Sequence, residues 1–159
     1  MGSRSKIDLA YIAGFLDGDG SLMLQIKKRK DTKQGWRFMC TICIYQDSRH
    51  SKPLEWMREI FGIGYLSHRK DGISELRVNG YKQVGVILKG LLPYIRFKEI
   101  QANALYEACD ILSSKTQKHL TEKDLRRLVT LILKIQGANY ATRSKKSEEE
   151  LLSILGLTP

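Results

Sequence analysis

Cysteine and long apolar runs are scarce in this chain of 159 residues, which carries three cysteines, an odd number. That count does not favour a disulfide framework, so we expect an intracellular, reducing setting. Cys40 and Cys43 have the spacing of a metal-binding pair, but residues three apart on a strand point to opposite faces and no second pair completes a zinc site. No stretch approaches about 18 consecutive apolar residues, and the N-terminus lacks the apolar core of a signal peptide. We therefore expect no membrane partner.

Acidic residues are outnumbered. Lysine and arginine together number 27 against 17 aspartates and glutamates, so the formal net charge at pH 7 is +10. Such an excess favours a polyanionic partner, which could be DNA, RNA or an anionic membrane. Six basic residues and a single acid stand between Lys27 and Arg37. A basic surface kept only for solubility would not require this clustering.

The length and the apolar fraction of 42% suffice for one domain with a hydrophobic core. We expect a tail or cloning remnant at residues 1–6 and one domain over residues 7–137, which includes C-terminal helices. Residues 138–159 form an extension with a basic run, an acidic run and a short helix.

The segment from Ile7 to Gly20 has the periodicity of a helix with two different faces. Apolar residues recur at helical spacing along one side. Gly14 and Gly18 stand four residues apart on another side, where the lack of side chains lets a second helix approach closely. Since each glycine inside a helix costs about 1 kcal/mol relative to alanine, we expect something large to pack on this face.

The same segment ends in two carboxylates at an unfavourable place. Asp17 and Asp19 flank Gly18 at the end of the predicted helix, where the helix dipole disfavours each acid by roughly 0.3–1 kcal/mol. A divalent cation would reverse that effect, and carboxylate and carbonyl oxygens suit Mg²⁺. Solvated acids on a glycine-rich helix end are the simpler interpretation, and spacing alone does not separate the two.

After Asp19 the apolar period changes from helical to two. Strands are predicted over residues 21–29 and 36–46, joined by a polar turn, and over residues 65–69 and 73–78, joined by an Asp-Gly turn. Their outward positions are rich in lysine, arginine and glutamine. Basic residues on the tip and outer face of a hairpin suit a DNA-reading β-ribbon, although a solvated charged loop would also account for the charge.

Helices are predicted between and after the two hairpins. They cover residues 51–62, 81–92, from 97 or 98 to 112, 121–137 and 147–156. Ser51, Thr121 and Ser147 are expected to cap three of them. Two consecutive hairpins with helices on one face indicate an α+β fold in the order αββαββα, followed by C-terminal helices.

Residues 12–20 read IAGFLDGDG, which strongly resembles the signature of the LAGLIDADG homing endonucleases. The αββαββα order over residues 7–112 also resembles the core of that family. The resemblance implies a saddle-shaped antiparallel β-sheet for DNA and an intron-homing enzyme that cuts double-stranded DNA. It also implies Mg²⁺ as the metal, with Mn²⁺ as a substitute. The protein would act where the genome or organelle DNA carries its target.

The resemblance assigns roles to single residues. Asp19 and the Gly18 carbonyl would bind the metal, and Asp17 would be more structural. Gln46 resembles the polar residue that orders water near the metal. Lys98 resembles the family's active-site lysine, which would stabilise charge at the phosphoryl centre or tune the pKa of a water.

One chain carries one acidic motif, whereas cutting both strands needs two metal-binding carboxylates. A homodimer solves this, because the glycine face of one helix can pack on its symmetry mate and bring both Asp19 side chains to the axis. A two-fold protein predicts a pseudo-palindromic target, and the resemblance implies cleavage that leaves short 3′ overhangs. The predicted dimer interface consists of Ala10, Tyr11, Gly14 and Gly18.

Two groups of residues are expected to meet DNA. Arginine and glutamine suit guanine and adenine, whereas lysines at the tips suit phosphates. The candidate base readers are Gln25, Lys27, Arg29, Arg37, Thr41, Arg69, Glu75 and Arg77, and the candidate phosphate contacts are Lys28, Lys30, Lys33 and Lys70. Where some relatives place an arginine after the catalytic glutamine, this chain has Arg49 and His50, either of which could serve.

Two other functions fit the same scaffold. A maturase would bind intron RNA and assist splicing, and such proteins can lose the metal site. A non-catalytic regulator would bind DNA at a specific site without cutting it. The two acids of the motif, Gln46 and Lys98 are all present, which favours the enzyme.

Overall fold

The computed structural model describes residues 4–140 and 142–159, so the first three residues of the predicted tail lie outside the described part. The elements agree with the predicted order to within a few residues at their ends and add three short 3₁₀ turns, η1 to η3. In chain order they are α1 (Lys6–Asp19), β1 (Gly20–Lys28), β2 (Trp36–Asp47), η1 (Ser48–His50), α2 (Lys52–Phe61), β3 (Tyr65–His68), β4 (Ile73–Asn79), α3 (Tyr81–Leu91), η2 (Leu92–Tyr94), α4 (Glu99–Ser114), η3 (Gln117–His119), α5 (Glu122–Ala138) and α6 (Glu148–Ile154).

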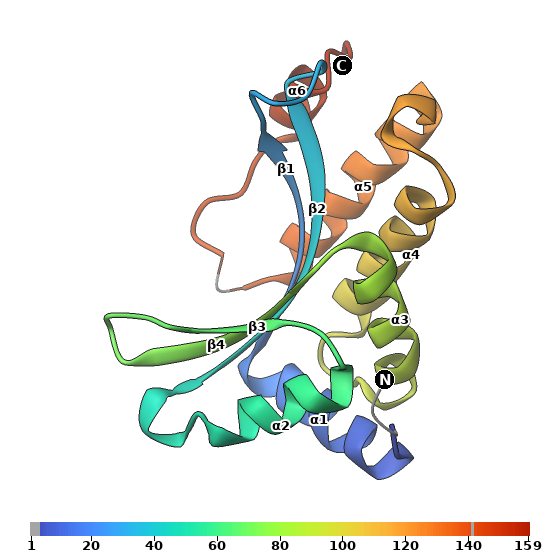
Figure 1. Ribbon diagram of the computed structural model, residues 1–159. Helices are drawn as coiled ribbons and strands as arrows, with labels where there is room; N and C mark the ends of the chain where they lie inside the picture. Colours follow the sequence, from blue (N-terminus) through green and yellow to red (C-terminus); the bar gives the residue numbers. More distant parts are fainter. Residues whose placement is uncertain (1–3, 141) are drawn as a thin grey trace.

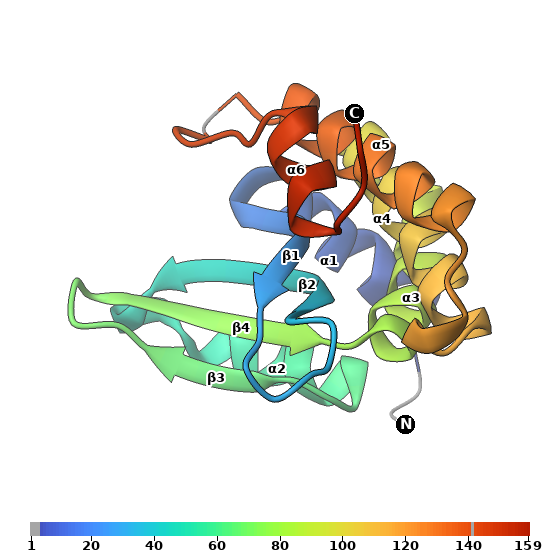
Figure 2. The same ribbon diagram turned by 90° about the horizontal axis from the view of Figure 1, so that it is seen from above.

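The strands form one antiparallel sheet in the order β1-β2-β4-β3. The long strand β2 pairs with β1 along Trp36 to Ile44 and with β4 along Thr41 to Asp47, so it belongs to both halves. The two halves diverge strongly: β1 and β2 run up the molecule while the β3–β4 hairpin extends sideways (Figure 1). Viewed from above, α3, α4 and α5 lie together on one side of this sheet (Figure 2). The predicted α+β fold is confirmed.

Side-chain capping explains two of the helix starts. Thr121 and Ser147 each accept the N–H of the third helical residue and form reciprocal capping boxes, as predicted. Ser5, which was not predicted as a cap, accepts the N–H of Asp8 at the start of α1. Ser51 occupies the N-cap position of α2 without a side-chain capping bond. Its backbone is already helical (φ −77°, ψ −13°), because the chain enters α2 directly from η1.

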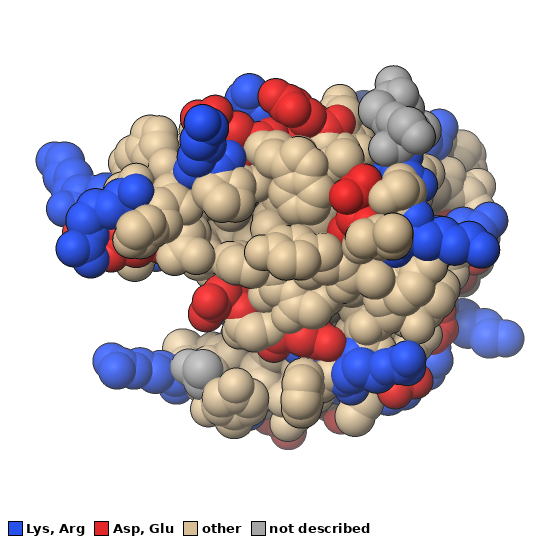
Figure 3. All heavy atoms as spheres, turned by 90° about the horizontal axis from the view of Figure 1, so that it is seen from below, with Lys and Arg blue, Asp and Glu red and all other residues tan. Residues whose placement is uncertain are grey.

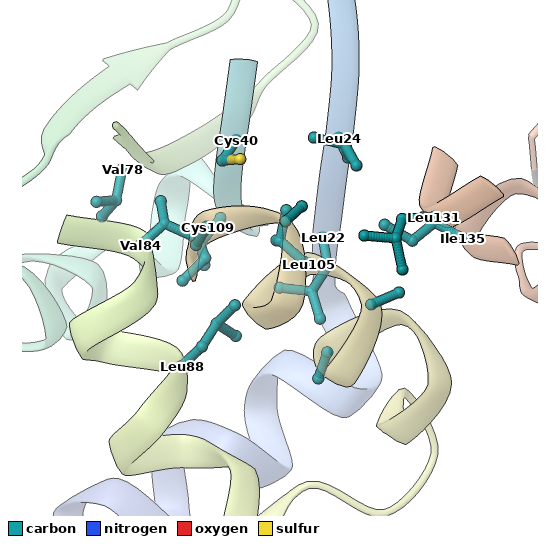
Figure 4. Close-up of a cluster of buried hydrophobic side chains, with 14 of the residues drawn as sticks. Leu22, Leu24, Cys40, Val78, Val84, Leu88, Leu105, Cys109, Leu131 and Ile135 are labelled. Carbon is teal, nitrogen blue, oxygen red and sulfur yellow. The ribbon is translucent and has the colours of Figure 1, made fainter. Parts of the chain in front are cut away.

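The core lies between the covered face of the sheet and the helices, and it includes buried residues of α1 and α2 as well as those of α3, α4 and α5. Figure 4 shows the cluster, in which the labelled side chains are Leu22, Leu24, Cys40, Val78, Val84, Leu88, Leu105, Cys109, Leu131 and Ile135. Cys40 lies here beside Cys109, whereas Cys43 contacts Glu75 on the other face of the sheet. This confirms that Cys40 and Cys43 point in opposite directions.

The last helix belongs to the same packed unit. Leu151 and Leu152 of α6 are buried in the core cluster, and α6 packs on α5. The end of the predicted extension is therefore docked on the domain by apolar contacts. None of the helices within residues 4–140 and 142–159 combines the length and the apolar character needed to span a bilayer.

Gly20 joins α1 to β1 at a place where no side chain fits. A Cβ built there would lie 2.7 Å from the Leu16 carbonyl oxygen, which the α1 backbone holds in place. We expect Gly20→Ala to lower the free energy of unfolding by about 1–3 kcal/mol. Gly137→Ala is the matched control, since its Cβ would meet nothing within 4 Å and alanine favours helix. Urea denaturation measures both, and equal losses would contradict this account of the junction.

Candidate active site and nucleic-acid interface

The C-terminal end of α1 is tied to the start of α4 by a lysine. The Lys98 ammonium donates to the carbonyl oxygens of Leu16 at 2.9 Å and Asp17 at 2.7 Å, and reaches the Gly18 carbonyl at 3.4 Å. These are carbonyls of the last turn of α1, where the helix dipole is negative. Lys98 therefore places its positive charge at the end of the acidic motif.

Asp17 makes the reciprocal connection. Its carboxylate accepts the backbone N–H of Arg96 at 2.7 Å and that of Lys98 at 3.0 Å. Both oxygens are thus used to hold the chain that leads into α4. Asp17 has the geometry of a positioning residue, since it fixes the backbone from which Lys98 reaches back to α1.

The environment of Lys98 acts on its charge in two opposite ways. Partial burial lowers the pKa of the Lys98 amine, and the negative charges of Asp17 and Asp19 counteract part of this effect. The net direction is downward.

Asp19 differs from Asp17 because its carboxylate is exposed and forms no hydrogen bond or ion pair with any described residue. The neighbouring Gly18 is exposed as well. Within residues 4–140 and 142–159, no group of three or more His, Cys, Asp or Glu side chains could enclose a metal. One free carboxylate with a nearby carbonyl fits Mg²⁺, which is commonly held by one or two carboxylates together with phosphates of a substrate.

A hollow of about 600 Å³ opens beside this helix end. It is lined from α1, β1, β2, α4 and the segment after α5 by residues that include Asp17, Gly18, Tyr45, Lys98, Gln101 and Asn139. Gln101, only 5% exposed, donates to the Ala138 carbonyl at 3.3 Å and to the Asn139 side chain at 3.2 Å. Gln101 was not among the residues predicted from the sequence. Its position one helical turn after Lys98 on α4 is the signal that could have indicated it.

Gln46 lies at the end of β2 on the helix-covered face, opposite Ser74 of β4. Its side-chain carbonyl accepts the N–H of Asp47 at 2.8 Å. It makes no hydrogen bond to Asp19 or Lys98 and does not line the hollow. The structure thus brings Asp17, Gly18 and Lys98 together and leaves Gln46 at the next strand end.

Arg49 and His50 are in different situations within η1. The Arg49 guanidinium binds both oxygens of Asp47, at 3.0 and 2.8 Å, and holds the pKa of that carboxyl well below its usual range. His50 is exposed and forms no hydrogen bond or ion pair with a described residue. Of the two candidates for the basic role, His50 is therefore the one whose side chain is not already paired with a described acid.

Most of the predicted base readers lie on the open face of the sheet, which is the face opposite the helix-covered one. Strand register places Lys27 opposite Arg37, and alternation puts Gln25, Glu75 and Arg77 on the same face. The tips of the two hairpins carry the remaining predicted contacts, which are Lys28, Arg29, Lys30, Lys33, Arg69 and Lys70. This distribution suits readout by the face and phosphate contact by the tips.

Thr41 is the least accessible of the predicted base readers. It lies on the open face but is only 1% exposed, and its hydroxyl donates to the Asn79 side chain at 2.7 Å. Asn79 pairs with Thr41 across β2 and β4 and is exposed, so it is the better candidate at this place. The alternation of β4, carried one residue past Val78, would have identified it.

The outward face of α1 is uncovered. A Cβ at Gly14 or Gly18 would meet nothing within 4 Å. Tyr11 is 59% exposed and Ile7 is 82% exposed, while Ala10 is partly covered. Figure 3 views the molecule from the side of α1 and α2, and the centre of this surface is largely uncharged, with most charged groups around it. Such a face suits packing against another protein surface.

A sequence profile described as LAGLIDADG endonuclease matches residues 12–99, which is more than half of the chain. The chain belongs to the LAGLIDADG endonuclease family. The glycine-rich end of α1, both hairpins and the lysine that caps α1 all fall within the matched segment.

Two curated relatives of this LAGLIDADG protein are DNA endonucleases. I-CvuI of Chlorella vulgaris is 30% identical over 104 residues, which are 65% of each chain. I-CreI of Chlamydomonas reinhardtii is 28% identical over 151 residues, which are 95% of this chain and 90% of that one. A crystal structure of I-CvuI with its DNA target and calcium is similar with a TM-score of 0.83 at 25% identity, over 97% of this chain and 98% of that one.

Asp17→Asn tests the positioning role assigned to Asp17 in this family member. The asparagine amide keeps one acceptor oxygen, but its NH₂ group would face one of the two backbone N–H groups that Asp17 accepts. We therefore expect the free energy of unfolding to fall by about 1.5–3 kcal/mol. Asp110→Asn is the control, because Asp110 is an exposed acid on α4 without a bonded partner among the described residues. Urea titrations compare the two variants, and equal stability would remove the assigned role.

Proposed function

We propose that this protein is a homing endonuclease that acts as a homodimer. It cleaves both strands of a long pseudo-palindromic duplex with a divalent metal, Mg²⁺ or Mn²⁺, and leaves short 3′ overhangs. The observation that carries the proposal is the free Asp19 carboxylate beside Lys98, at the end of a helix whose glycine face is uncovered. I-CvuI has been crystallised with its own DNA target in the presence of calcium, and with the I-CreI target in the presence of magnesium, where the DNA was not cleaved. These complexes support the DNA-binding part of the proposal.

Each site residue has one part in the proposed reaction. Asp19 and the Gly18 carbonyl would hold the metal, which when bound would lower the pKa of an attacking water and offset charge on the phosphate. Lys98 keeps a positive charge where negative charge develops on the oxygens of the pentacoordinate transition state. Asp17 holds Lys98 in that place, and Gln46 would orient water at the neighbouring strand end.

The homodimer supplies the second carboxylate. With the outward face of α1 packed on its symmetry mate through Gly14 and Gly18, two copies of Asp19 approach the two-fold axis. The open faces of the two sheets then continue each other along one duplex. Each protomer reads one half-site, so a pseudo-palindromic sequence is expected.

Cleavage selection tests this function. The protein is incubated with randomised long duplexes and Mg²⁺, with a chelator in a parallel reaction, and the cut ends are sequenced. We expect a two-fold-related motif with short 3′ overhangs that disappears with the chelator. Enrichment by binding without cut ends would contradict the endonuclease and favour a DNA-binding regulator. If the protein neither cuts nor enriches any duplex, and it binds intron RNA, a maturase would be favoured.

A further inference from the structure

The tripeptide Arg-Lys-Asp occurs twice, as residues 29–31 and residues 69–71. Each copy directly follows an outer strand of the sheet, β1 in one case and β3 in the other. In both copies the arginine Nη2 donates to Oδ2 of the aspartate two residues on, at 2.9 Å in the first and 2.5 Å in the second. The two hairpin tips, which we name the Arg-Lys-Asp turns, therefore carry the same ion pair.

The first turn orients its guanidinium by two hydrogen bonds, whereas Arg69 makes one bond to Asp71. Arg29 uses Nε and Nη2 toward the two oxygens of Asp31, each at 2.9 Å, in a forked arrangement. The other edge of this guanidinium keeps its N–H groups. In the second turn, Asp71 also accepts the N–H of Ile73 at 3.3 Å, which anchors the carboxylate to β4.

The same pattern extends to two further arginines on this side of the sheet. Arg77 pairs with Glu75 at 3.2 Å, and Arg49 pairs with Asp47 at 2.8 Å. The lysines of the predicted DNA surface behave differently, and none of them forms an ion pair with a described residue. These lysines are Lys27, Lys28, Lys30, Lys33 and Lys70. Arg37 is the exception among the predicted base-reading arginines, because it forms no ion pair with a described residue. Apart from Arg37, the structure separates arginines held by an acid from free lysines.

This separation has a predictable effect on DNA recognition. A free lysine attracts any phosphate and adds affinity without sequence information. An arginine held by an acid brings a carboxylate with it, and that carboxylate repels the phosphates of a duplex. The remaining guanidinium edge can still give the two parallel hydrogen bonds that distinguish guanine. Contact with a base is therefore favoured over contact with the backbone.

We infer that Asp31 and Asp71 are specificity-determining residues, which hold Arg29 and Arg69 as base readers at the two hairpin tips and weaken binding to non-target DNA. The inference rests on the proposed function, because it presumes that the sheet binds duplex DNA. It goes further by assigning to acidic residues a role within a basic surface.

The first measurement is binding to a random-sequence duplex as a function of salt. The variants are the double substitution Asp31→Asn with Asp71→Asn, and Asp110→Asn as a charge control on α4. We expect the double variant to bind this duplex about tenfold more tightly at low salt, with a slope of log K against log salt steeper by about 0.9 for each arginine released. The control should follow the parent protein. The side chains of Asp31 and Asp71 are at least half exposed, so the fold is retained.

The second measurement is selection from a randomised duplex library. The parent protein should enrich defined bases at the positions read by the tips, and the double variant should lose that preference while keeping the others. Asp31→Glu with Asp71→Glu should restore part of it. Equal behaviour of the double variant and the Asp110→Asn control would overturn the inference and leave the endonuclease proposal intact. A parent protein without salt-dependent duplex binding would overturn both.

Discussion

Asp19→Asn is expected to reduce DNA cleavage by about a thousandfold or more, because metal catalysis supplies several kcal/mol and each 1.36 kcal/mol is about tenfold in rate. The substitution keeps the size of the side chain and removes the charge that would hold the metal. Asp19 is exposed and bonded to no described residue, so the fold should be unaffected. Cleavage of the selected duplex and thermal unfolding measure the two effects separately.

The control for this prediction is Asp110→Asn, which removes one negative charge at a distance from the motif and should leave the cleavage rate unchanged. Asp19→Asn should still bind the duplex, with an affinity equal to or above that of the parent protein, since a repulsive charge has been removed near phosphates. Cleavage by Asp19→Asn at the parental rate would show that the metal is bound elsewhere.

Gly14→Leu is expected to convert the protein into a stable monomer that no longer makes double-strand breaks. Within one chain a Cβ at Gly14 would meet nothing within 4 Å, so the side chain starts in open space and we expect the isolated fold to accommodate it. In a helix pair the added side chain occupies space that the partner backbone needs. Overpacking costs about 1–3 kcal/mol for each copy and a two-fold dimer contains two, so dimer dissociation should be promoted about thirtyfold or more.

Gly137→Leu is the matched control for the dimer prediction. Gly137 is also a helical glycine with open space around its Cβ position, but it lies in α5 rather than on the outward face of α1. Sedimentation velocity over a range of concentrations should show a dimer for the control and a monomer for Gly14→Leu. A dimer that survives Gly14→Leu would show that another surface mediates association.

Local signals in the sequence were sufficient for the fold. Apolar periodicity located the hairpins, and the Thr121 and Ser147 caps follow from residue spacing alone. Ser51 failed as a cap because the conformation of a helix start also depends on the preceding segment, here η1, which the pattern did not reveal. Capping residues are thus predictable when a loop precedes the helix and less so when another turn does.

The sequence suggested candidate residues for the site but not the contacts between them. Resemblance to the family indicated Asp19 and Lys98, whereas the bonds from Lys98 to the α1 carbonyls depend on how α4 packs against α1. The burial of Thr41 could not be predicted, because strand alternation gives the face on which a residue lies and not how much the neighbouring strand covers it. Gln101 joins segments far apart in the chain, and no local pattern encodes such a contact.

We propose that the end of α1 binds the metal in each protomer, so that the two metal sites lie on opposite sides of a two-fold axis. Crystals of the protein with its selected duplex and Mn²⁺ would test it by anomalous scattering. We expect an anomalous peak in contact with the Asp19 carboxylate of each protomer, with the two α1 helices packed through Gly14 and Gly18. Peaks remote from Asp19, or a complex in which the α1 helices do not meet, would contradict it.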